Sequence, residues 1–154
     1  MTVVTHAISV LVLLGSGTTA GVLFAVAMST VPALATMTPD RFVYTHTLLG
    51  RNWDPTMPAI VLTTTVLDAT LAGLASGACA RSLFIVATVC LLGVSLISHL
   101  GNVPINRRIH QTDPNAIPPG WRDPRPLWRR WHLLRTTLAV LALAANGLAV
   151  TLLF

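Results

Sequence analysis

The stretch VVTHAISVLVLLGSGTTAGVLFAVAMSTVPALA, residues 3–35, contains no formally charged side chain. A transmembrane helix needs about 20 mostly apolar residues, and this run exceeds that length. It also lacks the basic segment that precedes the short apolar core of a signal peptide. We therefore expect a membrane-spanning helix that is retained in the protein.

Three further runs repeat this pattern. Residues 58–80 contain Asp68 as their single charge, residues 82–103 contain His99 as their only ionisable side chain apart from Cys90, and residues 136–154 contain none. We predict an all-α integral membrane protein with one domain, residues 1–154, built as a four-transmembrane-helix bundle. The expected helices are 5–34, 57–79, 82–110 and 128–153.

The predicted connections differ in length. The second and third helices meet in a tight hairpin around residues 80–82, and residues 36–56 form a loop between the first two helices. The loop at 111–127 is rich in proline and cannot be helical throughout. Gly17-x-x-x-Gly21 and Gly73-x-x-x-Gly77 predict close packing of helices.

The chain has few charged residues, and positive ones outnumber negative ones. The 154 residues are 53% hydrophobic and 10% charged, with a formal net charge of +5, whereas a soluble domain has about 25% charged residues. This deficit excludes an ordinary cytosolic enzyme. The arginines lie between apolar runs and form no basic domain, so we expect no nucleic-acid partner.

The arginines nevertheless indicate an orientation. One side of the predicted bundle holds Arg41, Arg51, Arg107, Arg108, Arg122, Arg125, Arg129 and Arg130, with Arg135 just inside the fourth helix. The other side holds Arg81 and the N-terminal amine. An excess of arginine in short loops marks the cytoplasmic side, so both termini should lie on the non-cytoplasmic side. For Arg122, Arg125, Arg129 and Arg130, orientation and contact with anionic lipid are a sufficient explanation.

Polar residues gather at the arginine-rich end. His99, Asn102, Asn106 and His110 follow helical spacing and form one stripe. Pro104 lies within the stripe, where it favours a kink or a water site.

The fourth helix and the first loop bring further polar side chains to this end. The fourth helix opens with one face made of Trp128, Trp131, His132 and Arg135, and the loop after the first helix carries Tyr44, His46, Arg51 and Asp54. Trp121 and Trp128 also suit interfacial anchoring. Polar groups in a membrane usually face a bundle interior or a cavity, so these clusters predict a site near the cytoplasmic face.

Asp68 lies apart from that end, near the middle of the second helix. Three interpretations stay open: a protonated acid, a hydrogen bond to the region of Thr63–Thr65 or to another helix, and a proton path.

A metal site is a further alternative. The histidines that could converge on one ion are His46, His99, His110 and His132. The chain has no Glu, which argues against a carboxylate-rich di-iron bundle. We assign no metal ligand, and a mononuclear Cu, Fe or Zn site remains the alternative.

Together these motifs resemble the anthrone oxygenase-like family of membrane proteins. The resemblance rests on Asn102-Val-Pro-Ile-Asn106-Arg, on Trp131-His132-x-x-Arg135-Thr, and on His46 followed by Asp54-Pro-x-Met57-Pro58. Met28-Ser-Thr-Val-Pro32 in the first helix fits too. The resemblance implies a four-helix membrane fold and, in characterised branches, O2-dependent oxidation of an anthrone to an anthraquinone in aromatic polyketide biosynthesis.

Such chemistry needs a base, an oxyanion stabiliser and an apolar pocket. His46 or His132 suits the base because a neutral imidazole accepts a proton. Asn102, Asn106 and Arg135 suit the oxyanion stabiliser. Tyr44 and Trp131 can stack on a planar polycycle, with His99 also near the substrate, and Asp54 can orient His46. The cofactors are unknown. In its simplest form, the expected reaction needs none beyond O2.

The sequence leaves other functions open. One is a metal-dependent membrane oxidase that acts on another small molecule, and the others are a non-catalytic membrane subunit, a carrier, and a structural bundle. The expected partners are a hydrophobic aromatic small molecule, O2 and membrane lipid in the cell membrane. A homo-oligomer remains open.

Overall fold

The structure, a computed structural model, describes residues 3–153 and is helical in every regular element of that range. Four long helical segments are long and apolar enough to cross a membrane, namely Val3–Ala35, Thr56–Leu74, Ala78–His110 and Arg125–Thr151. The predicted fold class is confirmed. The N-terminal amine, on Met1, lies outside the described residues.

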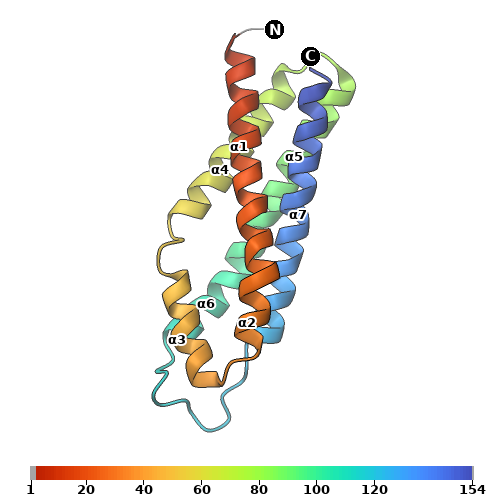
Figure 1. The fold of residues 1–154 in the computed structure, drawn as a ribbon. Coiled ribbons are helices and arrows are strands. Elements are labelled where there is room, and N and C mark those ends of the chain that lie inside the picture. The colour runs from red at the N-terminus through yellow and green to blue at the C-terminus, as the bar shows by residue number, and fades with distance from the viewer. Residues whose placement is uncertain (1–2, 154) are drawn as a thin grey trace.

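The elements run in a simple up-and-down order (Figure 1). They are α1 (Val3–Ala25), the π-helical segment η1 (Val26–Thr30), α2 (Val31–Ala35), α3 (Pro39–Gly50), α4 (Thr56–Leu74), α5 (Ala78–Ile97), the π-helical segment η2 (Ser98–Asn102), α6 (Val103–His110) and α7 (Arg125–Thr151). Neighbouring contacts join α1 to α7, α7 to α5, α5 to α4 and α4 to α1. The bundle is therefore a ring of four helices, with α1 diagonal to α5 and α4 diagonal to α7.

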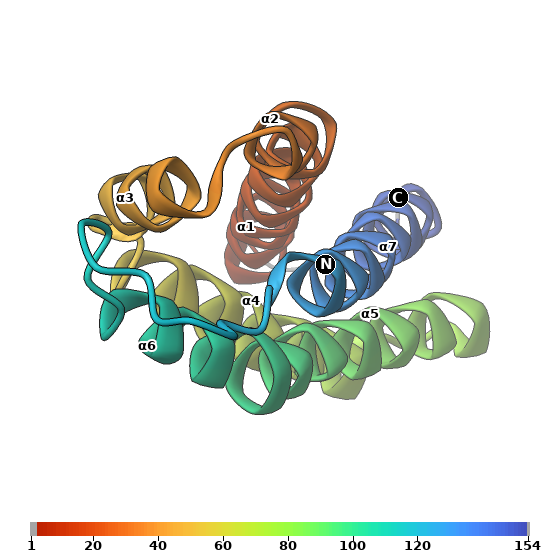
Figure 2. The same cartoon turned by 90° about the horizontal axis from the view of Figure 1, so that it is seen from below.

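The start of α1 and the end of α7 lie at the same end of the bundle (Figure 1). The opposite end holds α2, α3 and α6 together with the start of α7, as the view along the axis shows (Figure 2); we call it the cap end. α4 has 19 residues, about 28 Å of helix, close to the thickness of the hydrocarbon core. The segments Val3–Ala35 and Ala78–His110 have 33 residues each, about 50 Å, so they are longer than the hydrocarbon core is thick.

The segment between the first two spans is not a loop, and that expectation was wrong. Residues Pro39–Gly50 form α3, which buries Phe42, Val43 and His46. Pro39 occupies the first helical turn, where its missing N–H costs nothing, and Asp40 in the same turn complements the helix dipole. Burial of three residues at helical spacing holds α3 against α2 and α6.

The hairpin between the second and third spans also lies earlier than predicted. α4 ends at Leu74 and α5 begins at Ala78, with Gly77 as N-cap residue, rather than turning around residues 80–82. Arg81 contributes to this turn, because Nε and Nη2 both donate to the Ala75 carbonyl, at 3.3 and 2.8 Å. The irregular segment before α7 contains the prolines as expected, and Gly120 adopts a positive φ of 80° there.

Both Val-Pro dipeptides of the long helices follow a π-helical turn. η1 ends directly before Val31-Pro32, and η2 ends directly before Val103-Pro104. A proline ring inside a helix collides with the carbonyl four residues earlier, and a wider turn relieves that collision. The distortion expected at Pro104 therefore takes the form of a π turn, and the same device recurs at Pro32.

Glycines allow close contact at positions other than the predicted ones. A Cβ at Gly21, Gly73 or Gly77 would have no neighbour within 4 Å, and one at Gly17 would make an ordinary contact of 4.0 Å with Cδ1 of Leu143, so close packing does not depend on these motifs. At Gly101, by contrast, a Cβ would lie 2.8 Å from Cγ of Trp131. The close approach of α7 to η2 therefore depends on this glycine.

We predict that Gly101→Ala destabilises the bundle by about 1–3 kcal/mol, since the added methyl group must displace the rigid Trp131 ring. Gly21→Ala is the matched control, because its methyl group meets open space, and it should be neutral or slightly stabilising. Unfolding of both variants in the same detergent measures the difference. Equal stability of the two would contradict the role given to Gly101.

Candidate functional site

Four aromatic rings from three elements form a continuous row at the cap end. The ring centroids of His110 and His46 lie 6.2 Å apart, those of His46 and Trp128 lie 5.4 Å apart, and those of Trp128 and His132 lie 5.5 Å apart. Trp128 stacks on His132 with an interplanar angle of 20°, whereas His46 meets the indole edge-on at 76°. α3, α6 and α7 thus contribute three histidines and one tryptophan to a single row, in which Trp128 lies between His46 and His132.

His132 is fixed through both ring nitrogens. Arg135 donates from Nε and Nη2 to Nδ1, at 3.3 and 2.9 Å. Because a guanidinium has no acceptor, Nδ1 must be the unprotonated nitrogen, and Nε2–H then donates to the Leu23 carbonyl at 3.0 Å. Arg135 also donates from Nη1 to the Ser98 hydroxyl at 3.3 Å. His132 is fully buried and has no ring nitrogen left for a substrate.

His46 is buried but retains a free nitrogen. Its exposed fraction is 6%, and Nδ1 has no hydrogen-bond partner among the residues described. Burial lowers the pKa of His46 to about 4, the nearby His110 lowers it in the same direction, and the amide of Asn106 acts the opposite way. The imidazole is therefore neutral at pH 7 and can accept a proton at Nδ1.

Unpaired polar atoms accompany His46. Asn102 donates weakly from Nδ2 to the Trp128 carbonyl, at 3.5 Å. Four buried atoms in this region have no partner within the described structure: His46 Nδ1, Asn102 Oδ1, Asn106 Oδ1 and Trp128 Nε1. We call these four atoms the polar cluster. Buried polar atoms are rarely left unpaired, so this concentration marks a place where a polar group can bind.

The remaining predicted site residues lie outside the cluster. Tyr44 is 59% exposed, and His99 is exposed on η2. Trp131 is half-buried against Gly101. Asp54 is exposed in the turn before α4, and none of the hydrogen bonds described for residues 3–153 joins it to His46. The structure therefore brings His46, Asn102, Asn106, His132 and Arg135 together but leaves Tyr44, Asp54 and His99 apart.

The four histidines considered as metal ligands do not surround one point. The indole of Trp128 lies between His46 and His132, and His99 faces outward. Within the described residues, no group of three or more His, Cys, Asp or Glu side chains is arranged to hold a metal ion. No residue is therefore assigned as a metal ligand.

Two residues at this end have roles that the sequence did not reveal. Trp128 is not an interfacial anchor, because only 6% of it is exposed and it lies at the centre of the ring row. Its spacing of four residues from His132 was the available signal. The second residue is Arg125, which was assigned to topology and lipid contact.

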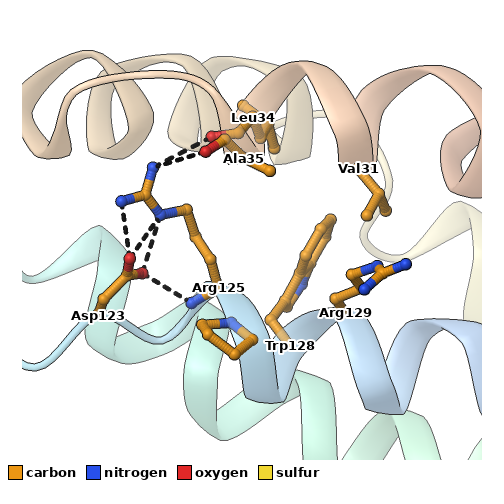
Figure 3. A pocket seen from close by; sticks show the side chains of 8 residues that line it. Val31, Leu34, Ala35, Asp123, Arg125, Trp128 and Arg129 are labelled. Carbon is orange, nitrogen blue, oxygen red and sulfur yellow. Dashed lines mark hydrogen bonds and ion pairs between the residues drawn. The ribbon is translucent and has the colours of Figure 1, made fainter.

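Arg125 binds the end of the first span (Figure 3). Nη1 donates to the carbonyls of Leu34, Ala35 and Met37, at 3.3, 3.5 and 2.6 Å, and Nη2 pairs with Asp123 at 2.7 Å. The guanidinium also lies 5.2 Å from the centroid of the Phe42 ring, a cation–π contact. Hydrogen bonds from Arg125 hold the pKa of Asp123 below its usual range. Arg125 thus joins α2, α3 and the start of α7.

Two cavities open beside this assembly. One of about 270 Å³ is lined by Val31, Leu34, Ala35, Asp123, Arg125, Pro126, Trp128 and Arg129 (Figure 3). Another of about 230 Å³ lies between α2 and α3 and is lined by Ser29, Thr30, Ala33, Leu34, Met37, Thr45 and Leu49. His46 and His132 line neither of these two cavities, whereas Trp128, which contacts both rings, lines the larger one. The predicted shared chamber is instead a packed cluster next to an open cavity.

Comparison with known proteins agrees with the arrangement of motifs. The family model described as anthrone oxygenase matches residues 46–145, about two thirds of the chain. This chain belongs to the anthrone oxygenase family. The matched region begins at His46 and includes α4 to most of α7, so it leaves out the first span that was also thought to resemble the family. No curated protein and no solved structure matches the chain.

We predict that Arg125→Lys lowers the free energy of unfolding by about 1–3 kcal/mol, because an ammonium group cannot reproduce the planar set of hydrogen bonds to carbonyls and carboxylate. Arg122→Lys is the control, since Arg122 is exposed, and it should change stability by less than about 0.5 kcal/mol. Thermal unfolding in detergent measures both. A loss no larger for Arg125→Lys than for the control would contradict the bridging role.

The lowered pKa of His46 predicts a pH dependence of stability. Its unfolded value is near 6.5 and its folded value about 4, so between these pH values the unfolded chain binds more protons. Stability from this residue is complete above about pH 6.5 and falls by roughly 3 kcal/mol as the pH drops to 4. His46→Gln should remove that part of the pH dependence, whereas His6→Gln should retain it. Unfolding measured from pH 4 to 8 compares them, and identical profiles for wild type and His46→Gln would refute the assignment.

Proposed function

We propose that this membrane protein uses O2 to oxidise a planar, hydrophobic substrate of the anthrone class, with His46 as the base. The observation that carries the proposal is the polar cluster, in which a neutral imidazole, two amides and an indole N–H are unpaired inside an otherwise apolar packing. Membership of the anthrone oxygenase family supports the same chemistry.

The cavity beside Trp128 suits the substrate. Its walls combine aliphatic side chains with the indole, and a flat polycycle can stack on an indole. Arg129 at the rim is exposed, and Arg125 is neutralised by Asp123, so the rim favours a polar or anionic edge of the ligand. A substrate stacked on the indole would have its reactive carbon directed toward His46, whose ring contacts the same indole.

The reaction balances without a further reductant. The base removes a proton from the benzylic carbon between the two aryl rings, and the resulting enolate gives up electrons to O2 as a C–O bond forms. The peroxide then takes a proton and loses water, which leaves a carbonyl at that carbon. One anthrone and one O2 therefore give one anthraquinone and one water.

His46 suits the base better than His132 does. The free Nδ1 of His46 can take the proton, whereas both nitrogens of His132 are occupied. A pKa of about 4 makes a weak base, but an enolate beside the ring would raise it, since an opposite charge favours the imidazolium. Trp128 Nε1–H and the Asn106 amide can then hydrogen-bond the enolate oxygen.

The other polar residues hold this arrangement in place. Asn102 bonds the main chain of Trp128, and Arg135 fixes His132, on which the indole stacks. These are positioning residues in the proposal, which revises the expectation that Arg135 meets an oxyanion.

The membrane setting suits both reactants, because O2 and an apolar polycycle concentrate in lipid. The excess of arginine at the cap end predicts that the site faces the cytoplasm. We propose that the enzyme lies in the cell membrane, and membership of the anthrone oxygenase family supports a place in a pathway that makes aromatic polyketides.

We predict that His46→Ala lowers O2-dependent oxidation of an anthrone by about 10²–10⁴-fold, the usual contribution of a general base. His6→Ala, at the far end of the bundle, should retain activity. Oxygen uptake and quinone formation by protein in lipid vesicles measure the effect. Full activity of His46→Ala would remove the base assignment, and activity that follows the content of one tightly bound metal would favour a metal-dependent oxidase instead.

A further inference from the structure

A second polar pair lies deep in the bundle, away from the cap end. Asp68 on α4 and Asn146 on α7 are both 0% exposed. Asn146 Nδ2 donates to Asp68 Oδ2 at 3.3 Å. Since α4 and α7 are diagonal to each other in the ring of helices, this hydrogen bond crosses the core. Asn146 follows His132 by about 21 Å of helix, so the pair is separate from the candidate site.

The hydrogen bond leaves one oxygen on each side chain without a partner. Both Asp68 Oδ1 and Asn146 Oδ1 are buried and unpaired in the described structure. The carboxyl and carboxamide groups are planar and have the same shape. When two such groups pair edge to edge in one plane, the remaining oxygens lie on the same side of the pair. If Asp68 were ionised, two acceptors would face each other and a buried charge would be uncompensated.

Among the described residues, no buried hydroxyl of α1 or α4 donates to either of these oxygens. The buried hydroxyls of α1 and α4 each donate to a carbonyl four residues earlier on their own helix, namely those of Ser9, Ser16, Thr19, Thr64 and Thr65. The expected hydrogen bond between Asp68 and the Thr63–Thr65 region therefore does not form, and the partner on another helix is the one observed.

Charged groups do not supply the compensation either. Within residues 3–153, the other titratable groups of this half of the bundle are His6 on α1 and Cys79, Arg81 and Cys90 on α5. The guanidinium of Arg81 donates hydrogen bonds to the Ala75 carbonyl. Within the described residues the one ion pair, Arg125 with Asp123, lies at the cap end.

We propose that Asp68 binds a proton and forms a cyclic acid–amide pair with Asn146. The proton sits on Oδ1 and is donated to Asn146 Oδ1, while Asn146 Nδ2 continues to donate to Oδ2. A single proton forms a hydrogen bond between Asp68 Oδ1 and Asn146 Oδ1 and neutralises the buried carboxylate. The pair lies between the two core clusters of the bundle, since Val61 and Ala145 belong to one and Leu71 and Ala149 to the other. The neutral pair links α4 to α7, which are diagonal to each other in the ring of helices.

Infrared spectroscopy of the full chain in lipid bilayers tests the proposal. A protonated carboxyl group has a C=O stretching band that is distinct from the bands of a carboxylate. We expect this band at neutral pH and above, where exposed carboxyls have ionised. Asp68→Asn should abolish it, and the control Asp113→Asn, at an exposed aspartate, should leave it unchanged. Absence of the band in wild type, or its survival in Asp68→Asn, would overturn the proposal.

Stability provides a second readout. An asparagine at position 68 can form an amide–amide pair of the same shape, so Asp68→Asn should keep the melting temperature, whereas Asp68→Ala should lower it by several degrees. The exchange variant Asp68→Asn/Asn146→Asp should restore the infrared band, because it rebuilds the acid–amide pair in reverse. A large loss of stability in Asp68→Asn, or a wild-type band that disappears when Na⁺ or K⁺ is added, would show that an ionised Asp68 is required. O2-dependent oxidation should be unchanged in Asp68→Asn.

Discussion

The hydrogen bond from His132 Nε2–H to the Leu23 carbonyl sets the geometry of the cap end. It is possible only because Arg135 occupies the other nitrogen and thereby selects the tautomer. Once the imidazole is fixed between α1 and α7, its flat face supports the indole of Trp128. The indole edge then meets His46, which in turn brings α3 against α7. A single tautomer therefore connects the transmembrane bundle to the helix that carries the free imidazole.

The polar groups of the bundle fall into two classes that differ in how they are satisfied. His132, Arg135 and Ser98 form a closed network, in which each group finds a partner inside the protein. The polar cluster around His46 does not close, although it lies within the same set of packed rings. Unpaired polar groups in a low-dielectric setting lower the stability of the folded state. The hydrogen bonds of the closed network offset part of this destabilisation. A ligand that forms hydrogen bonds with these atoms therefore gains binding free energy from groups that have no partner in the protein.

How much of this could be predicted depends on the range over which each feature acts. The four spans follow from charge-free runs whose length matches the membrane, and the grouping of His46, Asn102 and His132 follows from helix period and up-and-down order. α3 was missed because its helical signal is local: Pro39 and Asp40 begin it, but its burial depends on partners far along the chain. The roles of Arg125 and Trp128 were missed for a related reason. An arginine or tryptophan near a membrane surface has an adequate explanation in lipid contact, and only the distances to carbonyls and rings distinguish a structural role.

The extent of the family match gains a physical explanation from the same contacts. The match covers residues 46–145 and leaves out α1, although α1 is a partner of His132. What α1 supplies to His132 is the main-chain carbonyl of Leu23, and the end of the first span meets Arg125 through three further carbonyls. A carbonyl is present whatever the side chain, so these contacts demand a helix at the correct distance and make no demand on residue type. The residues that contribute side chains to these contacts, namely His46, Asn102, Asn106, Trp128, His132 and Arg135, all lie within the matched range. The first span therefore supports the site through main-chain carbonyls, which depend on the position of the helix and not on its side chains.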